Sequence, residues 1–286
     1  MRGKGKIMDT ISVNKDRCIL CGACVDTCPA HIFFDDEKEI KTRHPEYCIG
    51  CGHCAAVCPE DAVVHSGLDL SSFIPAPKGP GVTPDLLTAF LRSRRSCRAY
   101  LDKEVPKELL ERLIDMARYA PTGHNAQNVA FVVVSDRPTI KKLSGLAAEF
   151  YGNLALMIEK SPDQFTPFVR DMLPGFQRNY EFYKAGKDRI FRGAPVVCLL
   201  YASPDNRSSG DNCVLASLHI VLTAHASGLG SCINGYFVSA AEYVPDIKEI
   251  LKIPAADKIY GCVALGWPAH HFVKLPARKE AEVMFI

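Results

Sequence analysis

The feature that most constrains this chain is a cysteine pattern that occurs twice near its beginning. It reads CILCGACVDTCP from Cys18 to Pro29 and CIGCGHCAAVCP from Cys48 to Pro59, so each copy has the form CxxCxxCxxxCP. Every cysteine of the second copy lies thirty positions after its counterpart in the first. A loop with CxxCxxC spacing can turn three sulfurs toward one small object, whereas the fourth cysteine, which precedes a proline, cannot comfortably close the same cage. The chain therefore contains an internal duplication that carries ligand chemistry.

The duplicated run resembles that of bacterial ferredoxins, in which it supplies three ligands to one [4Fe-4S] cluster while its fourth cysteine ligates the other cluster. The resemblance implies two [4Fe-4S] clusters with interleaved ligands: Cys18, Cys21, Cys24 and Cys58 for the first, and Cys48, Cys51, Cys54 and Cys28 for the second. Two structural zinc sites are one alternative, although these usually show paired CxxC knuckles. Disulfides are another, and they would need an oxidising compartment.

The length, net charge and hydropathy of the chain indicate how many domains, which partners and which compartment to expect. The 286 residues are enough for one small and one large domain. A formal net charge of +2 predicts no strong field for nucleic acid or an anionic membrane, so we expect neither as a partner. No apolar run approaches the length that crosses a bilayer, and the opening MRGKGKIMDT lacks the apolar stretch of a secretory signal. We therefore expect a cytoplasmic protein.

A proline-rich stretch separates two parts of the chain. EDAVVHSG predicts a short strand that closes a ferredoxin-like domain over residues 1–68, and SSFIPAPKGPGVTP follows with four prolines and two glycines. Such a stretch cannot continue a helix or fill a central strand, so we interpret residues 69–84 as an extended linker. The larger domain then covers residues 85–286.

The larger domain mixes helical and strand patterns. Thr83 and Pro84 favour a helix start, and apolar residues at helical spacing over 107–120 predict a second helix that ends at Pro121. Strands are expected at 128–136, 194–203 and 258–268, the first of them central, with further helices in 139–192 and 211–228. This alternation predicts an α+β fold around a mixed sheet.

Three segments and the end of this domain carry further chemistry. RRSCRAY, from Arg94 to Tyr100, concentrates guanidiniums that suit a phosphate, or else form a solvated basic patch or a nucleic-acid contact. APTGHNAQN, 120–128, offers three amides, although a simple turn is the alternative. GLGSCINGYF, 228–237, has glycines that permit close approach of a backbone to a ligand. LPARKE adds two basic residues near the C-terminus.

In their order along the chain, these segments resemble the nitroreductase family of FMN-dependent oxidoreductases, from Thr83 onward. The resemblance implies that Arg98 lies at the pyrimidine edge of the flavin, where a cation stabilises the anionic reduced form. It further implies phosphate and ribityl contacts from Arg94, Arg95, Ser96, Arg278 and Lys279, ring contacts from Asn125, a loop shaped by Pro121 and Gln127, and backbone contacts to flavin N5 and O4 from Ile233, Asn234 and Gly235. The sequence departs from the family pattern at Tyr100, Asn128 and Ile233, where phenylalanine, proline and tryptophan are usual.

Together these features predict an electron-transfer flavoenzyme that passes electrons from two [4Fe-4S] clusters to FMN and on to a nitroaromatic, a quinone or an activated alkene. No GxGxxG follows a strand, so no Rossmann nicotinamide site is expected. The alternatives are an NAD(P)H-dependent flavin reductase that uses the clusters as an electron exit, and a non-catalytic electron carrier. A ferredoxin or another redox protein is the expected donor, the family implies a homodimer, and no proton donor is identified.

Overall fold

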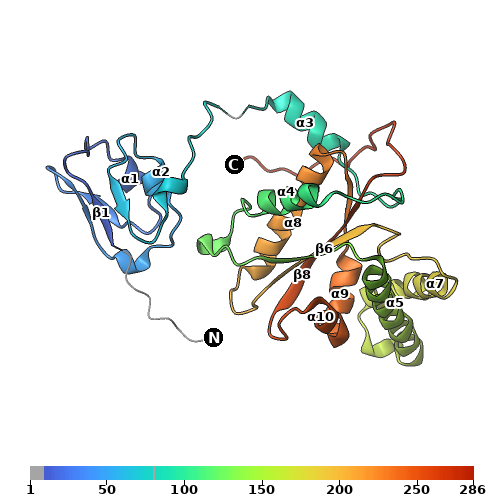
Figure 1. Ribbon diagram of the computed structural model, residues 1–286. Helices are drawn as coiled ribbons and strands as arrows, with labels where there is room; N and C mark the ends of the chain where they lie inside the picture. The colour runs from blue at the N-terminus through green and yellow to red at the C-terminus, as the bar shows by residue number, and fades with distance from the viewer. Residues whose placement is uncertain (1–9, 80) are drawn as a thin grey trace. The chain divides into compact units, whose positions relative to one another are not determined.

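The structure is a computed structural model that describes residues 10–79 and 81–286 (Figure 1). It divides into two compact units. Unit 1 comprises Met1–Gly81 together with His124–Ala126, and unit 2 comprises Val82–Gly123 and Gln127–Ile286. The basic opening segment considered above as a possible signal lies, but for its last residue, outside the described residues.

Unit 1 repeats one small motif, as the duplicated sequence does. In each half, a glycine with positive φ precedes a short helix: Gly22 at 75° before α1 (Ala23–Thr27), and Gly52 at 74° before α2 (His53–Ala56). Two antiparallel strand pairs complete the unit: β1 (Ile11–Val13) with β4 (Val63–His65), and β2 (Phe33–Asp35) with β3 (Ile40–Thr42). Its core consists of seven buried residues, two of which are Cys24 and Cys54.

Unit 2 is built on a four-stranded sheet in the order β5-β6-β8-β7. The strands are β5 (Ala130–Val134), β6 (Val196–Ala202), β7 (Gly230–Ile233) and β8 (Lys258–Gly266), and all neighbouring pairs are antiparallel. An isolated parallel β-bridge between Ser96 and Ser231 accompanies these antiparallel pairs, so the sheet has both parallel and antiparallel pairing. The helices are α3 (Pro84–Ser93), α4 (Lys107–Ala117), α5 (Arg137–Lys160), α6 (Pro167–Asp171), α7 (Leu173–Lys184), α8 (Ser209–Ala226), α9 (Gly235–Tyr243) and α10 (Pro245–Leu251).

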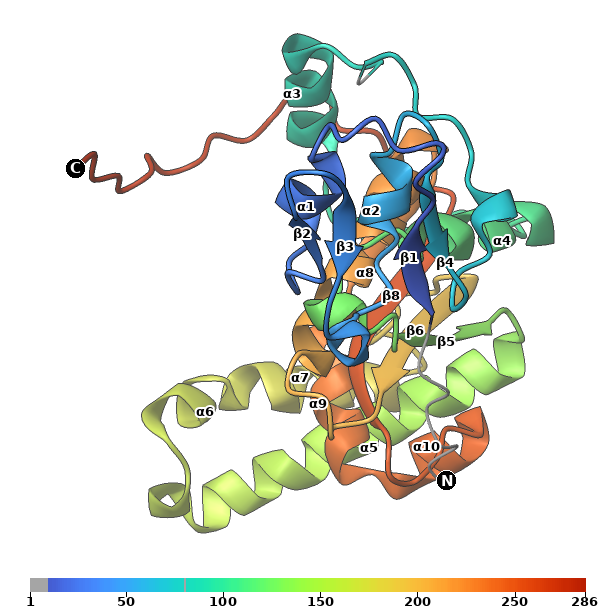
Figure 2. The same ribbon diagram turned by 90° about the vertical axis from the view of Figure 1, so that its left-hand side faces the viewer.

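Helices cover both faces of this sheet, and β6 shows why. Alternate residues of a strand point to opposite faces. Val196, Cys198 and Leu200 belong to the core shared with α4 and α8, while Val197 and Leu199 belong to the core shared with α5, α9 and α10. Figure 1 shows the strands between α8 on one side and α9 and α5 on the other, and Figure 2 shows α6 and α7 beside α5, away from the strands. Because β6 is buried on both faces, its sequence is a run of mainly apolar residues rather than an alternation of apolar and polar ones.

Local sequence accounts for several helix starts. The Thr83 hydroxyl accepts a hydrogen bond from the Leu86 N–H at 3.3 Å, and Pro84 follows as the first residue of α3. The Asp136 carboxylate accepts from the Thr139 N–H at 2.8 Å, with proline again in the first turn of α5. These are N-caps that satisfy N–H groups without partners inside the helix.

The α+β fold class expected from the sequence is confirmed, with two differences in detail. β5 was expected to be central, but it lies at an edge of the sheet, and most of its residues are only half-buried. β7 (Gly230–Ile233) falls in the glycine-containing segment 228–237, where the sequence predicted no strand. In the described part of the chain, no helix combines the length and apolar character needed to span a bilayer.

Candidate cofactor sites

The eight cysteines of the duplicated run line two separate cavities of unit 1. One cavity is lined by Cys28, Cys48, Cys51 and Cys54, and the other by Cys18, Cys21, Cys24 and Cys58. The fold thus gathers the cysteines into the two interleaved sets expected for a pair of clusters, with the fourth cysteine of each copy in the cavity of the other. All thirteen cysteines of the chain are free thiols. Among the described residues, no three His, Cys, Asp or Glu side chains converge on a single metal ion.

The chemistry of these sulfurs suits a cationic inorganic group. Burial raises the pKa of the Cys54 thiol to about 11, and the negative charges of Cys28, Cys51 and Cys48 add to the effect. Burial also raises the pKa of Cys24. Cysteine ligates iron as the thiolate, and a bound iron–sulfur cluster would compensate the negative charge that burial disfavours at Cys24 and Cys54.

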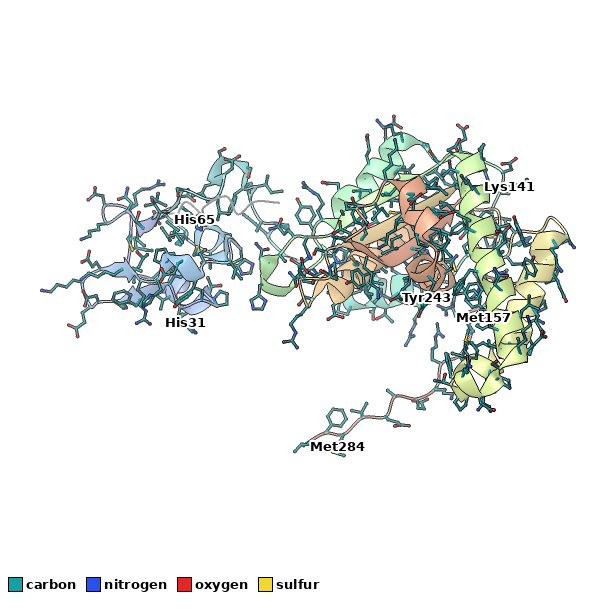
Figure 3. All side chains as sticks on the ribbon, turned by 90° about the horizontal axis from the view of Figure 1, so that it is seen from below. His31, His65, Lys141, Met157, Tyr243 and Met284 are labelled. Atoms are coloured by element: carbon teal, nitrogen blue, oxygen red, sulfur yellow. The ribbon has the colours of Figure 1, made fainter. Side chains whose placement is uncertain are left out.

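Backbone N–H groups point at three of the sulfurs. Gly50 N–H donates to Cys48 Sγ at 3.3 Å, Ala62 N–H donates to Cys58 Sγ at 3.2 Å, and Ile32 N–H donates to Cys28 Sγ at 3.5 Å. A further contact was missed by sequence reasoning, because nothing near His65 marks it as special. Its ring Nε2 lies 3.3 Å from Cys48 Sγ, and the side chain is buried (Figure 3).

In unit 2, an arginine cavity gathers most of the expected phosphate ligands. The cavity measures about 830 Å³ and is lined by Arg92, Arg94, Arg95 and Arg278, but not by Lys279. The Nε of Arg95 is buried and, among the described residues, has no hydrogen-bond partner. Leaving a buried donor unsatisfied costs free energy. A phosphate oxygen would satisfy this atom, so the arginine cavity fits the phosphate end of FMN.

The RRSCRAY and GLGSCINGYF segments are joined side by side. Ser96 bridges Ser231, and the Cys97 N–H donates to the Ser231 carbonyl at 2.8 Å. A Cβ on Gly230 would come within 2.6 Å of Cys97 Sγ, so only glycine permits this approach. The pairing brings Ser96 and the 233–235 backbone into one part of unit 2.

Within the second segment, Asn234 is buried and fixed at both ends of its carboxamide. Its Oδ1 accepts from the Phe237 N–H at 3.0 Å and caps α9, while its Nδ2 donates to the Ile190 carbonyl at 2.7 Å. Ile233, where the family has tryptophan, is 54% exposed. Gly235 has open space around its Cα. The exposed Ile233 and Gly235 therefore leave the backbone here open to a ligand.

A chain of amides holds the 120–128 loop against the start of α8. Asn212 Oδ1 accepts from the Gly123 N–H at 3.0 Å, and Asn212 Nδ2 donates to Asn128 Oδ1 at 2.8 Å. Asn128 Nδ2 in turn donates to the Ser209 hydroxyl at 2.9 Å. This network explains asparagine at position 128, where the family has proline. Sequence reasoning missed Asn212 and Ser209, which lie more than eighty residues away.

Pro121, Asn125 and Gln127 are the residues of the 120–128 loop that are expected near the flavin. Pro121 and Gln127 are exposed, and the Gln127 N–H donates to the Thr122 hydroxyl at 3.1 Å. Asn125 belongs to unit 1, where its Nδ2 donates to the carbonyls of Ile49 at 3.2 Å and Gly50 at 2.9 Å. Asn125 therefore lies in unit 1, and the other expected flavin ligands lie in unit 2.

Arg98 lines a different cavity from the other arginines of its segment. This cavity of about 590 Å³ is lined by Arg98, Ala99, Tyr100, Lys187, Asp188, Arg189 and Arg192. The Tyr100 hydroxyl donates to the carbonyls of Cys97 at 3.0 Å and Ala264 at 3.4 Å, which explains tyrosine in place of phenylalanine. Burial raises the pKa of Tyr100 well above its usual value, so the phenol stays protonated at neutral pH.

The fold and these sites define an iron–sulfur flavoprotein class, and comparison with known proteins places the chain within it. The model of the nitroreductase family matches residues 91–267, and that of a 4Fe-4S dicluster domain matches residues 10–59. The chain therefore belongs to the nitroreductase family and carries a 4Fe-4S dicluster domain at its N-terminal end. This confirms the resemblance and the prediction of an FMN-dependent oxidoreductase.

Individual relatives agree with this placement. The chain is 29% identical over 191 residues to an NADH dehydrogenase of Thermus thermophilus, covering 65% of this chain and 87% of the relative. It is 27% identical over 207 residues to a 4-nitrobenzoate reductase of Pseudomonas putida, covering 64% and 86%. A crystal structure of a nitroreductase with bound FMN from Bacteroides fragilis shares the fold, with a TM-score of 0.56 at 22% identity over 70% of this chain and 98% of that one.

Proposed function

We propose that this protein carries electrons from two [4Fe-4S] clusters to FMN and on to an organic acceptor. The observation that supports it most is that one chain holds two four-cysteine cavities and an arginine cavity with an unsatisfied buried Arg95 Nε. Cys18, Cys21, Cys24 and Cys58 would ligate one cluster, and Cys48, Cys51, Cys54 and Cys28 the other. When bound, these cofactors supply one-electron transfer at the clusters and two-electron transfer at the flavin.

The residues of unit 2 would bind and orient the flavin. Arg94, Arg95 and Arg278 neutralise the phosphate, and the 233–235 backbone offers polar groups in a segment fixed by Asn234. Arg98 supplies the positive charge that favours an anionic reduced ring. Burial raises the pKa of Tyr100, and its hydroxyl hydrogen-bonds to two backbone carbonyls, so it serves as a packing residue rather than as an acid.

Nitroaromatics, quinones and activated alkenes are the proposed acceptors, and a relative named 4-nitrobenzoate reductase supports the first class. A ferredoxin or another redox protein is the proposed donor. A homodimer is proposed from the family, and α3 supports it, since Leu86, Leu87 and Leu91 are each between 46% and 64% exposed on one helix.

Anaerobic reoxidation tests this function. The FMN-loaded, cluster-loaded protein is reduced under argon and then mixed with a nitroarene or a quinone, while flavin absorbance is followed. Reoxidation much faster than that of free FMN at the same concentration supports an enzyme. Reoxidation at the rate of free FMN would instead favour the non-catalytic electron carrier.

A second candidate keeps catalysis but takes hydride from NAD(P)H, with the clusters as the electron exit. The relative named NADH dehydrogenase favours it. Rapid mixing with NADH discriminates the two directions, because the exit route requires flavin bleaching first and cluster bleaching second. Reduction by ferredoxin or dithionite, but not by NADH, rules this direction out.

A further inference from the structure

We infer that the acceptor carries an anionic group, most simply a carboxylate, and that a basic loop of unit 2 holds it. This basic loop, residues 187–192, contributes Lys187, Arg189 and Arg192 to the 590 Å³ cavity that Arg98 also lines. The inference rests on the proposed function, since it names the substrate class of the same flavin site.

The charge of this cavity is not balanced by the protein. Four cationic side chains and one carboxylate, Asp188, line it. Within the described part of the chain, none of the four cations forms an ion pair with a carboxylate within 4.0 Å. A concave surface with several cations and no paired anion raises the local concentration of anionic ligands.

Asp188 is occupied in folding the basic loop. Its Oδ1 accepts from the Ser144 hydroxyl at 2.6 Å and from the Ile190 and Phe191 N–H groups at 2.9 and 3.0 Å, and its Oδ2 accepts from the Gly193 N–H at 3.1 Å. These bonds use the oxygens that would otherwise pair with Arg189 or Arg192. The same bonds give the loop one fixed shape.

The cationic side chains are also partly pre-positioned. The Arg189 guanidinium lies 4.3 Å from the ring centroid of Phe182, and the Lys187 ammonium lies 5.9 Å from the same centroid. Arg192 is half-buried and has a positive φ of 59°, a conformation that the surrounding structure must hold. Because less side-chain freedom is lost on binding, such residues bind an anion more tightly than free surface lysines do.

The basic loop is hydrogen-bonded to one of the segments expected to hold the flavin ring and lines a cavity with the other. The Ile190 carbonyl accepts from Asn234 Nδ2 at 2.7 Å, which links the loop to the 233–235 backbone. Arg98, from the RRSCRAY segment, lines the same cavity. A carboxylate bound to Arg189 and Arg192 would therefore anchor an acceptor beside the flavin segments. Planar guanidiniums recognise carboxylates with paired hydrogen bonds, which neutral analogues cannot accept equally well.

Paired substrates test this inference in the loaded protein. The kcat/KM for 4-nitrobenzoate is compared with that for 4-nitrobenzamide, its neutral isostere, with dithionite-reduced protein as the electron source. The first two-electron step converts the nitro group to a nitroso group, consumes two protons and releases one water molecule. The carboxylate should be preferred about tenfold or more, as expected for a charge-assisted pair, and the preference should fall at high salt.

Variants of the basic loop identify the residues responsible. Arg189→Gln and Arg192→Gln should each reduce the carboxylate-to-amide ratio of kcat/KM toward one. Lys184→Gln is the matched control, because Lys184 is an exposed cation that stacks on Tyr180 and lies outside the cavity. The control should keep the wild-type ratio.

Three results would overturn the inference: equal kcat/KM for the two substrates in the wild-type protein, an equal loss for both in the variants, or a changed ratio in Lys184→Gln. An equal loss would show that the basic loop acts on the flavin and not on the acceptor. If neither substrate is reduced, the proposed function fails. The binding of benzoate against benzamide, measured calorimetrically, then tests the charge preference by itself, and equal affinities would refute it.

Discussion

Replacing His65 should change the reduction potential of one cluster and not the other. The Gly67 N–H donates to His65 Nδ1 at 3.1 Å, so that nitrogen is an acceptor and the ring proton lies on Nε2. Nε2 then donates to Cys48 Sγ at 3.3 Å, and the ring is only 4% exposed. The corresponding position thirty residues earlier is Asp35, an exposed residue whose carboxylate accepts from the Glu37 N–H. The cavity lined by Cys28, Cys48, Cys51 and Cys54 therefore has an imidazole donor that the other four-cysteine cavity does not share at this position, and a cluster held there would differ from its duplicate.

The size of the effect follows from this hydrogen bond. Reduction adds negative charge to the cluster sulfurs, so an N–H donor stabilises the reduced state more than the oxidised one. If His65→Leu removes about 1 kcal/mol of that preference, the one-electron potential should fall by about 40 mV. His65→Gln keeps an N–H donor and should restore part of the loss. His31→Asn is the control, because His31, labelled in Figure 3, is an exposed imidazole of the same unit for which the described residues offer no hydrogen bond to a sulfur.

An anaerobic redox titration followed by EPR measures both cluster potentials in each variant. We expect His65→Leu to lower one potential and to leave the other in place, and we expect His31→Asn to change neither. This expectation would be refuted by two potentials that shift together, or by none that shifts. Unchanged FMN content in the variant confirms that unit 2 is intact.

Three further predictions concern unit 2. Gly230→Ala should lower the free energy of unfolding by about 1–3 kcal/mol, because the added Cβ would lie 2.6 Å from Cys97 Sγ. Urea unfolding measures the loss, and Gly235→Ala is the control because a Cβ at that position meets open space. Asn128→Ala should lower the free energy of unfolding by about 1–3 kcal/mol, because Asn212 Nδ2 and the Ser209 hydroxyl lose their hydrogen bonds to Asn128. The variant should also release FMN faster, which flavin fluorescence detects. Burial and the charge of Arg94 lower the pKa of His225, so the imidazole binds a proton more readily in the unfolded chain than in the folded one. The free energy of unfolding should therefore decline as the pH falls below the ordinary pKa of histidine. His225→Gln should reduce this decline, which unfolding measured at several pH values detects.

Those parts of the fold that local sequence specifies were predictable. The cysteine spacing indicates that the first three sulfurs of each copy share a site, because a CxxCxxC loop is short enough to fix its own geometry, whereas the fourth, interleaved cysteine was expected only from the resemblance to bacterial ferredoxins. Thr83 and Pro84 mark the start of α3 through contacts within one turn. The apolar run of β6 predicts a strand buried on both faces, and its alternate residues enter two different cores.

Long-range contacts were not predictable in the same way. β5 has the composition of a central strand, but its place at the edge depends on the order of strands that lie far apart in sequence. The bond from Asn234 to Ile190 and the contact from His65 to Cys48 likewise join residues that no local pattern relates. β7 is four residues long and begins with glycine, a residue that is unfavourable in strands, so the local sequence did not predict a strand there.

The most direct test of electron flow from the clusters through FMN to the acceptor is a count of the electrons that the reduced protein delivers. The fully reduced protein is mixed anaerobically with more than two equivalents of a quinone, which accepts two electrons per molecule, and flavin absorbance and cluster EPR signals are followed together. We predict that the quinone removes the two electrons of FMN and then one from each cluster, four in all, and that Cys18→Ala, with FMN still bound, delivers fewer. A flavin that is reoxidised while both cluster signals persist would contradict this prediction.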